Sequence, residues 1–180
     1  MKIFKPYSSG FTLVEMLVVI AIIAILTGII VTDIAGSKAK SRDAERASDL
    51  AQIQLAIEQF FDRCDVYPVS PLSTSDNGTI DGVTYCPSGV TLENFISVIP
   101  TDPSGAGAPL GTSTYGYTTN YDTSSTLYPQ PTDYVLYTKF EASNSVLSQS
   151  APAPTSWTPS FPSGFSCTNA TGLDYCVRPN

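Results

Sequence analysis

The sequence predicts an α+β fold, in which one long N-terminal helix packs against a small antiparallel β-sheet. Two observations carry this prediction. No proline interrupts residues 11–63, and apolar residues recur there at helical spacing. Residues 114–121 are rich in β-forming side chains, and residues 133–141 alternate along the chain as a half-buried strand does. The amphipathic part of the helix needs a partner layer, and the two strands supply it.

Residues 1–10 form a short basic leader, and residues 11–31 form an almost uninterrupted apolar run. At about 1.5 Å per residue this run spans roughly 31 Å as a helix, which is enough to cross a bilayer core. The sequence therefore predicts a transmembrane helix over residues 11–31. Glu15 lies inside the run, where a carboxylate is costly unless it has a partner.

A secretory signal peptide and a plain membrane anchor are the two alternatives for this region. The apolar run is longer than an ordinary signal-peptide core, and no good small-x-small cleavage site follows it. A plain anchor fits the length of the run, but it gives Glu15 no role.

The start of the apolar run carries a specific motif, which reads Gly10-Phe11-Thr12-Leu13-Val14-Glu15. This motif resembles the processing site of type IV pilins and of type II secretion pseudopilins. The resemblance implies that a membrane-bound prepilin peptidase cleaves between Gly10 and Phe11, on the cytoplasmic side, and N-methylates Phe11. It also implies an assembly platform and a motor ATPase as partner proteins.

Glu15 is implied to be the fifth residue of the mature chain. A glutamate cannot be solvated in hydrocarbon, but it can pair with the free amine of Phe11 in a neighbouring subunit. Because such pairing selects one register as subunits add, we expect Glu15 to align the subunits of a helical homopolymer.

Residues 32–63 are expected to continue the helix as an amphipathic segment. Its apolar stripe consists of Leu50, Ile53, Ile57 and Phe60, at spacings of three and four. Charged residues precede this stripe, and we interpret them as a solvated helix face whose basic members meet lipid head groups or acidic neighbours. These residues are Lys38, Lys40, Arg42 and Arg46, interleaved with Asp43, Glu45 and Asp49.

Residues 64–180 are expected to form a globular, β-rich head, with its sheet packed on the apolar stripe of the helix. The predicted elements are a small hairpin over 79–85, a short helix at 91–96, the strands 114–121 and 133–141 joined by a loop holding Pro129 and Pro131, and short edge strands at 165–167 and 175–178. Residues 142–164, rich in serine, threonine and proline, are expected to form a loop.

The head contains four cysteines, which allow three pairings: Cys64, Cys86, Cys167 and Cys176. Sequence proximity favours Cys64–Cys86 and Cys167–Cys176. Disulfides persist outside the cytoplasmic membrane, where the head is expected to lie. By resemblance, the second bond closes a C-terminal loop of the kind that pilins expose. A zinc site is not expected, because the chain has no histidine and no CxxC motif.

Neither catalysis nor a cofactor is predicted. A chain without histidine lacks the commonest general base, and no glycine-rich phosphate loop is present. Beyond residue 65 the chain has two basic and eight acidic residues, so no nucleic-acid partner is predicted. Asp102, Asp122 and Asp133 are weak candidates for a calcium site like that of some secretion pseudopilins, with turn capping as the alternative.

The sequence thus predicts a structural protein. Its first interpretation is a subunit of an extracellular type IV pilus-like filament, inserted beforehand into the cytoplasmic membrane as a single-pass precursor. Adhesion, twitching motility and DNA uptake are possibilities that the resemblance brings with it. The first alternative is a pseudopilin that acts as the periplasmic piston of a type II secretion system. The second alternative is a monomeric, membrane-anchored binding domain.

Overall fold

The computed structural model describes the backbone of residues 10–80, 82–105, 113–122, 130–143, 145–152, 167 and 173–179, together with their side chains except those of 29–35, 121, 122 and 130. The chain divides into two compact units, Met1–Lys38 and Ala39–Asn180. The leader residues 1–9 lie outside the described residues.

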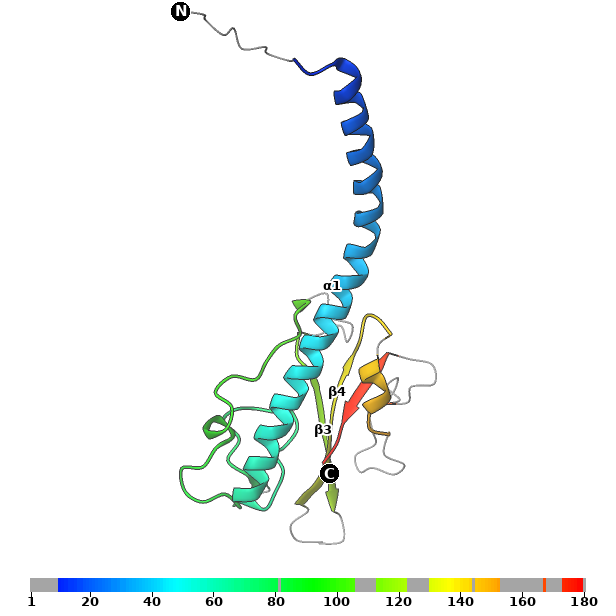
Figure 1. Ribbon diagram of the computed structural model, residues 1–180. Helices are drawn as coiled ribbons and strands as arrows, with labels where there is room; N and C mark the ends of the chain where they lie inside the picture. Colours follow the sequence, from blue (N-terminus) through cyan, green and yellow to red (C-terminus); the bar gives the residue numbers. More distant parts are fainter. Residues whose placement is uncertain are drawn as a thin grey trace, which may run out of the picture. The chain divides into compact units, whose positions relative to one another are not determined.

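The helix α1 runs from Leu13 to Cys64, which confirms the predicted long helix (Figure 1). Every described side chain from Phe11 to Gly28 is exposed. Among the residues whose side chains are described, no helix is long and apolar enough to cross a membrane. The segment predicted to do so, residues 11–31, includes three residues whose side chains lie outside that set.

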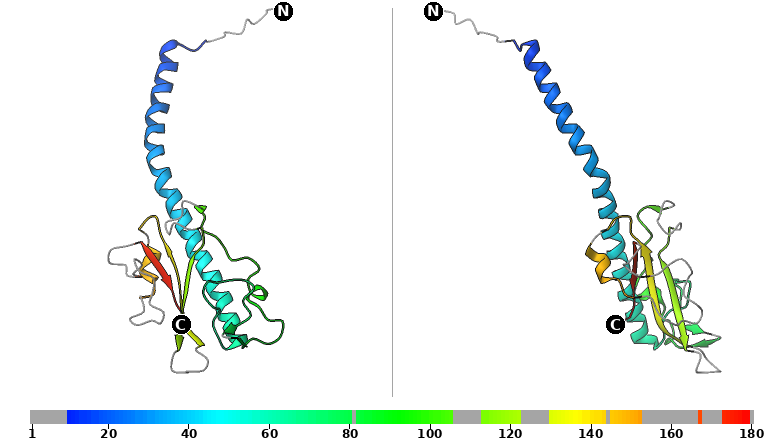
Figure 2. Two further views of the ribbon diagram at one scale, coloured as in Figure 1. Left: turned by 180° about the vertical axis from the view of Figure 1, so that it is seen from behind. Right: turned by 90° about the vertical axis from the view of Figure 1, so that its right-hand side faces the viewer.

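The head contains a three-stranded antiparallel sheet in the order β3-β4-β5. Its strands are β3 (Gly116–Asp122), β4 (Gln130–Lys139) and β5 (Asp174–Val177). Within the second unit, the sheet forms a layer beside α1, as the two views of Figure 2 show. The α+β architecture predicted from the sequence is therefore confirmed.

The core lies between α1 and this sheet. Leu50, Ile53 and Ile57 of the helix are at most 1% exposed and pack with Tyr134 and Leu136 of β4. Several buried tyrosines also hold the helix through their hydroxyl groups. Tyr134 donates a hydrogen bond to Glu58 Oε1 at 2.7 Å, and Tyr115 donates one to Asp49 Oδ2 at 2.5 Å.

The smaller elements follow the predictions with some differences. The predicted hairpin is formed by β1 (Thr79–Ile80) and β2 (Val83–Thr84), and the predicted short helix is the 3-10 helix η1 (Leu92–Asn94).

A second 3-10 helix, η3 (Ser145–Gln149), interrupts the loop expected over 142–164, most of whose remainder lies outside the described residues. The edge strand expected at 175–178 is β5. The one expected at 165–167 is described only at Cys167, which is not in a strand.

The position of Pro131 was predicted wrongly. It lies in strand β4 rather than in the loop before it, opposite Tyr121 and next to a register shift that follows Asn120. Proline has no N–H group to donate to the ladder of hydrogen bonds between strands. It is tolerated where that ladder is already irregular, which explains how β4 continues through Pro131.

Candidate processing and assembly site

The Gly10–Phe11 junction lies on exposed backbone just before α1 begins. Both residues are exposed, Phe11 to 78%, and neither belongs to a helix or strand. An ideal Cβ atom at Gly10 would meet nothing within 4 Å. A protease needs an accessible and irregular segment of chain, and this junction has both properties.

Thr12 and Glu15 form a capping box at the first turn of α1. The backbone N–H of Thr12 donates to Glu15 Oε2 at 2.8 Å, and the Thr12 hydroxyl donates to the same oxygen at 2.7 Å. In return, the N–H of Glu15 donates to Thr12 Oγ1 at 3.3 Å. This reciprocal pairing satisfies backbone donors that the first turn of a helix otherwise leaves free.

The capping box was missed from the sequence, although a threonine followed three residues later by a glutamate is its recognised signature. It changes the chemistry expected of Glu15. In the single chain the carboxylate already has partners at its own helix start, so pairing with a neighbour's amine would exchange one set of contacts for another. The assembly role of Glu15 stays a prediction.

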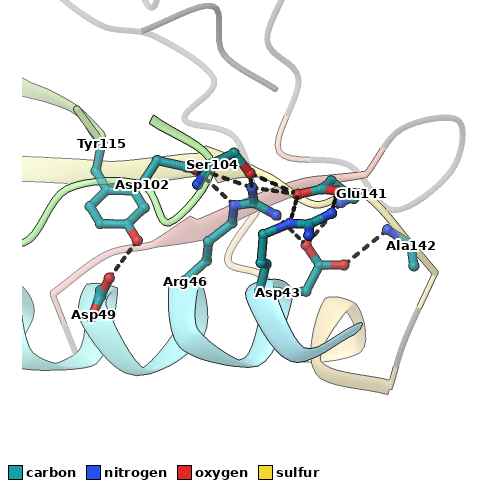
Figure 3. Close-up of polar contacts among 9 residues, drawn as sticks. Asp43, Arg46, Asp49, Asp102, Ser104, Tyr115, Glu141 and Ala142 are labelled. Carbon is teal, nitrogen blue, oxygen red and sulfur yellow. Dashed lines mark hydrogen bonds and ion pairs between the residues drawn. The ribbon is translucent and has the colours of Figure 1, made fainter. Parts of the chain in front are cut away.

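A buried ionic cluster, centred on Arg46, joins α1 to two distant segments of the head (Figure 3). The Arg46 side chain is 0% exposed. Its guanidinium donates to both carboxylate oxygens of Asp102, at 2.7 and 2.9 Å, and to Ser104 Oγ at 2.7 Å. It also donates to Asp43 Oδ1 at 2.7 Å and to Glu141 Oε1 at 2.6 Å.

A second layer of contacts supports this Arg46 cluster. Asp43 accepts hydrogen bonds from the backbone N–H groups of Glu141 and Ala142, both at 2.9 Å. Arg42 forms a two-pronged ion pair with the carboxylate of Glu141. Each buried charge in the cluster therefore has partners, which is the condition under which buried ions are tolerated.

The Arg46 cluster lowers the pKa values of two of its carboxyl groups. The hydrogen bond from Arg42 is the largest influence on Glu141. With help from Arg46 and Ser104 it outweighs burial and lowers the pKa of Glu141 to about 2. Burial alone would raise the pKa of Asp102, but the hydrogen bonds from Arg46 and from the Ser104 N–H group leave it lowered. Both carboxyl groups are thus held in the ionised form.

The interpretation of the charges in residues 38–49 as a solvated face was wrong for Asp43 and Arg46, which are both buried. The expectation that basic residues of this segment meet acidic side chains is confirmed for Arg42 and Arg46. The spacing of the residues contains a signal for this. Asp43, Arg46, Leu50 and Ile53 follow one another at intervals of three and four, so the two charged residues continue the apolar stripe on the same helix face. Lys38 and Lys40 are exposed, as expected.

The structure contains two disulfides, Cys64–Cys86 and Cys167–Cys176, which is the pairing that sequence proximity favours. The first joins the last residue of α1 to the segment after β2 and lies in a buried apolar cluster with Phe60. The second packs on Val135, on the face of the sheet that points away from α1.

The three calcium candidates are not brought together as far as the structure describes them. Asp102 binds Arg46, whereas Asp133 forms an ion pair with Arg178. Arg46 also contacts Glu141, just after the end of β4, and Asp133 lies near the start of that strand. The side chain of Asp122 lies outside the described residues.

Comparison with known proteins places the N-terminal motif in a family. Residues 5–31 match the family described as the prokaryotic N-terminal methylation motif. Over 64 residues the chain is 36% identical to the type IV major pilin protein PilA of Myxococcus xanthus, a match that covers 36% of this chain and 29% of PilA. These matches support a likeness of the chain to the type IV pilin and type II secretion protein G family.

Type II secretion proteins are also among the relatives. Over 98 residues the chain is 28% identical to the type II secretion system core protein G of Escherichia coli, covering 53% of this chain and 66% of the relative. Over 103 residues it is 28% identical to core protein G of Aeromonas hydrophila, covering 56% of this chain and 71% of the relative. The matches thus span less than two thirds of both PilA and the Escherichia coli protein. No solved structure matches the chain.

The family motif covers the residues that form the candidate site. Gly10, Phe11 and Glu15 all lie within residues 5–31, whereas the Arg46 cluster lies outside that range. The relatives that share this part of the chain are a type IV major pilin and type II secretion core proteins G.

Proposed function

We propose that this chain is the structural subunit of an extracellular, type IV pilus-like filament, matured by prepilin peptidase between Gly10 and Phe11. One observation carries the proposal. The described side chains of residues 11–28, directly after the junction, are all exposed, and most of them are apolar. Such a surface gains free energy by burial, at about 25 cal/mol per Å². Copies of the same helix, bundled side by side, would bury it.

The proposed assembly pathway starts at the cytoplasmic membrane, with the precursor inserted through its apolar helix. Cleavage after Gly10 creates a free amine at Phe11, which the peptidase methylates and which stays a cation. Glu15 of an incoming subunit exchanges its contacts with Thr12 for this amine on a neighbour. A platform protein and a motor ATPase, as other chains, drive the extraction of subunits from the membrane.

A type II secretion pseudopilin is the second candidate function, favoured by how far the matches extend. The core protein G relatives align with 53–56% of this chain, whereas PilA aligns with 36% of it. The serine- and threonine-rich composition of residues 142–164 and the C-terminal disulfide instead support a surface fibre, because a polar segment suits an exposed filament surface.

The test combines N-terminal mass spectrometry with negative-stain microscopy of material sheared from cells. A chain that begins at methylated Phe11, in fibres that extend from the cell, is the expected result. A chain that begins at Phe11 but stays in the envelope would favour the pseudopilin. An intact Met1 would overturn both and leave a membrane-anchored monomer.

A further inference from the structure

The apolar contact between α1 and the sheet specifies its own register poorly. The buried side chains Leu50, Ile53, Ile57 and Phe60 follow one another at intervals of three, four and three residues. Sliding the sheet by one helical turn, about 5.4 Å, would set most of these side chains where a neighbour of similar size had been. Apolar residues of about the right volume are largely interchangeable in a core. Something else must therefore hold the register.

Arg46 cannot be moved in this way. It is 0% exposed, and its partners Asp102 and Glu141 belong to the head, whereas Asp43 lies on the helix beside it. A one-turn slide in one direction would carry the charge of Arg46 among the apolar side chains of the sheet. A slide in the opposite direction would set Leu50 in the place of Arg46 and leave Asp102 buried without a counter-ion. Removing one partner of a buried ion pair is far more costly than losing a solvated one.

The other polar contacts between α1 and the sheet are weaker constraints. Asp49, Glu58 and Gln54 bind Tyr115, Tyr134 and the backbone of Arg178 respectively. The three helix side chains are partly exposed. Water can reach these three helix side chains, so a slide would leave at most the neutral hydroxyls of Tyr115 and Tyr134 without a partner. That costs less than a buried charge without its counter-ion.

The disulfide Cys64–Cys86 is the second fixed point, at the far end of the contact. It joins the last residue of α1 to the head covalently. The helix is thus held at one end by a bond and at the other by the Arg46 cluster.

We propose that Arg46 is a positioning residue that sets the register of the head on α1, and that with Cys64–Cys86 it forms a pair of redundant register locks. Either lock alone keeps the native register, and loss of both lets the sheet slide along the helix. In a filament built from α1, this register fixes the height of each sheet along its own helix. That consequence rests on the proposed function, whereas the register itself does not.

The test measures a distance within the full-length chain in detergent micelles. Nitroxide labels are attached through a ketone amino acid at Gln59 and Lys139, which are both exposed, so that the native cysteines stay untouched. Gln59 lies about 20 Å along the helix from Arg46, so a slide changes the distance between the two labels. Double electron–electron resonance then reports one distance for each register. The variants are Arg46→Met, Cys64→Ser/Cys86→Ser, and their combination.

We expect the native distance in Arg46→Met alone and in the disulfide variant alone. The combined variant should show a second population, displaced by up to about 5 Å for a one-turn slide. If the combined variant does not fold, Arg46→Lys with Cys64→Ser/Cys86→Ser replaces it, since lysine keeps the charge but loses the two-pronged contact to Asp102.

Arg42→Met in the same disulfide-free background is the matched control. Arg42 contacts Glu141 from a partly exposed position one turn earlier, so its loss should leave the native distance alone. A single native distance in whichever Arg46 variant folds without the disulfide would overturn the proposal. So would the same second population in the Arg42 control. Neither result depends on whether the chain forms a filament.

Discussion

Thr138 is a buried residue whose hydroxyl has no hydrogen-bond partner among the described residues. A buried hydroxyl without a partner costs about 1–3 kcal/mol in proteins. Thr138→Val keeps the shape of the side chain and removes that cost, so we expect the free energy of unfolding to stay constant or rise by about 1 kcal/mol. Urea unfolding of the full chain in detergent measures the change.

The control for this substitution is Thr118→Val, on the neighbouring strand β3. Thr118 is only half-buried, and its residue number places it on the opposite face of the strand from buried Thr119. We expect a change within about 0.5 kcal/mol there, as for most surface substitutions. A loss of more than 1 kcal/mol on replacing Thr138 would mean that its hydroxyl has a partner after all.

Thr12 is the second residue whose contribution can be measured directly. Its hydroxyl accepts the N–H of Glu15, and its carbonyl accepts the N–H of Met16 at 3.3 Å. Loss of an N-cap side chain costs about 1 kcal/mol. We therefore expect Thr12→Ala to accelerate hydrogen exchange at the Glu15 amide about fivefold in micelles, whereas Thr12→Ser preserves protection. Equal exchange in both variants would contradict the capping role.

At the scale of elements, α1 and strands β3 and β4 could be predicted because their signals are local. Residue spacing in 50–60 and alternation in 133–141 depend only on neighbours along the chain. The Arg46 cluster could not be predicted in this way. Its partners Asp102 and Glu141 lie 56 and 95 residues away, and the pairing exists only once the head has folded around the helix.

The Thr12–Glu15 capping box is the opposite case, because its signal is local and was overlooked. Because Glu15 lies within an apolar run, its carboxylate was interpreted only through the cost of placing a charge in a membrane. The simpler explanation, that it caps its own helix, needs only the threonine three residues earlier. Both explanations can hold, one before assembly and one after it.

The Arg46 cluster makes the attachment of α1 to the head depend on pH. The folded-state pKa of Glu141, about 2, lies below its ordinary value of 4.5, and that of Asp102 is also lowered. The unfolded chain thus binds more protons than the folded chain in this range. Their contribution to stability is complete above about pH 4.5 and is lost as the pH falls towards 2.

Glu141→Gln tests this pH dependence. Glutamine does not titrate, so we expect the variant to be less stable than the natural chain at pH 7 but to lose less stability between pH 4.5 and 2. Urea midpoints measured across that range give, for each chain, the slope of stability against pH. Glu93→Gln, at an exposed carboxylate of η1 outside the cluster, is the control. Parallel slopes for Glu141→Gln and the natural chain would contradict the assignment.

On the scale of the whole molecule, the two compact units contribute differently to stability. The buried side chains of the described core all belong to Ala39–Asn180. We therefore expect a chain truncated to residues 39–180 to keep the unfolding free energy of the full chain, as urea denaturation measures it. A second truncation, to residues 47–180, removes Arg46 but keeps the apolar stripe.

The two truncations differ by eight residues, so their comparison isolates residues 39–46 of α1, which include Arg42, Asp43 and Arg46. Without Arg46 the carboxylate of Asp102 is left buried and unpaired, which typically costs 3–5 kcal/mol. We expect the shorter chain to lose about 3 kcal/mol or more. Equal stability of the two chains would show that the Arg46 cluster contributes nothing to the attachment of α1.

The proposed polymerisation would involve the whole molecule. Substitutions at Glu15 separate two roles of its side chain in that process, capping of its own helix and pairing of its charge. Glu15→Ala removes both the cap on Thr12 and the charge, whereas Glu15→Gln keeps an oxygen acceptor for Thr12 and removes the charge alone. If the charge pairs with a neighbour's amine, both variants should be processed at Gly10–Phe11 and inserted in the membrane, yet both should yield few sheared fibres. Normal fibres from Glu15→Gln alone would assign the role to the cap. Normal fibres from both would show that Glu15 does not align the subunits.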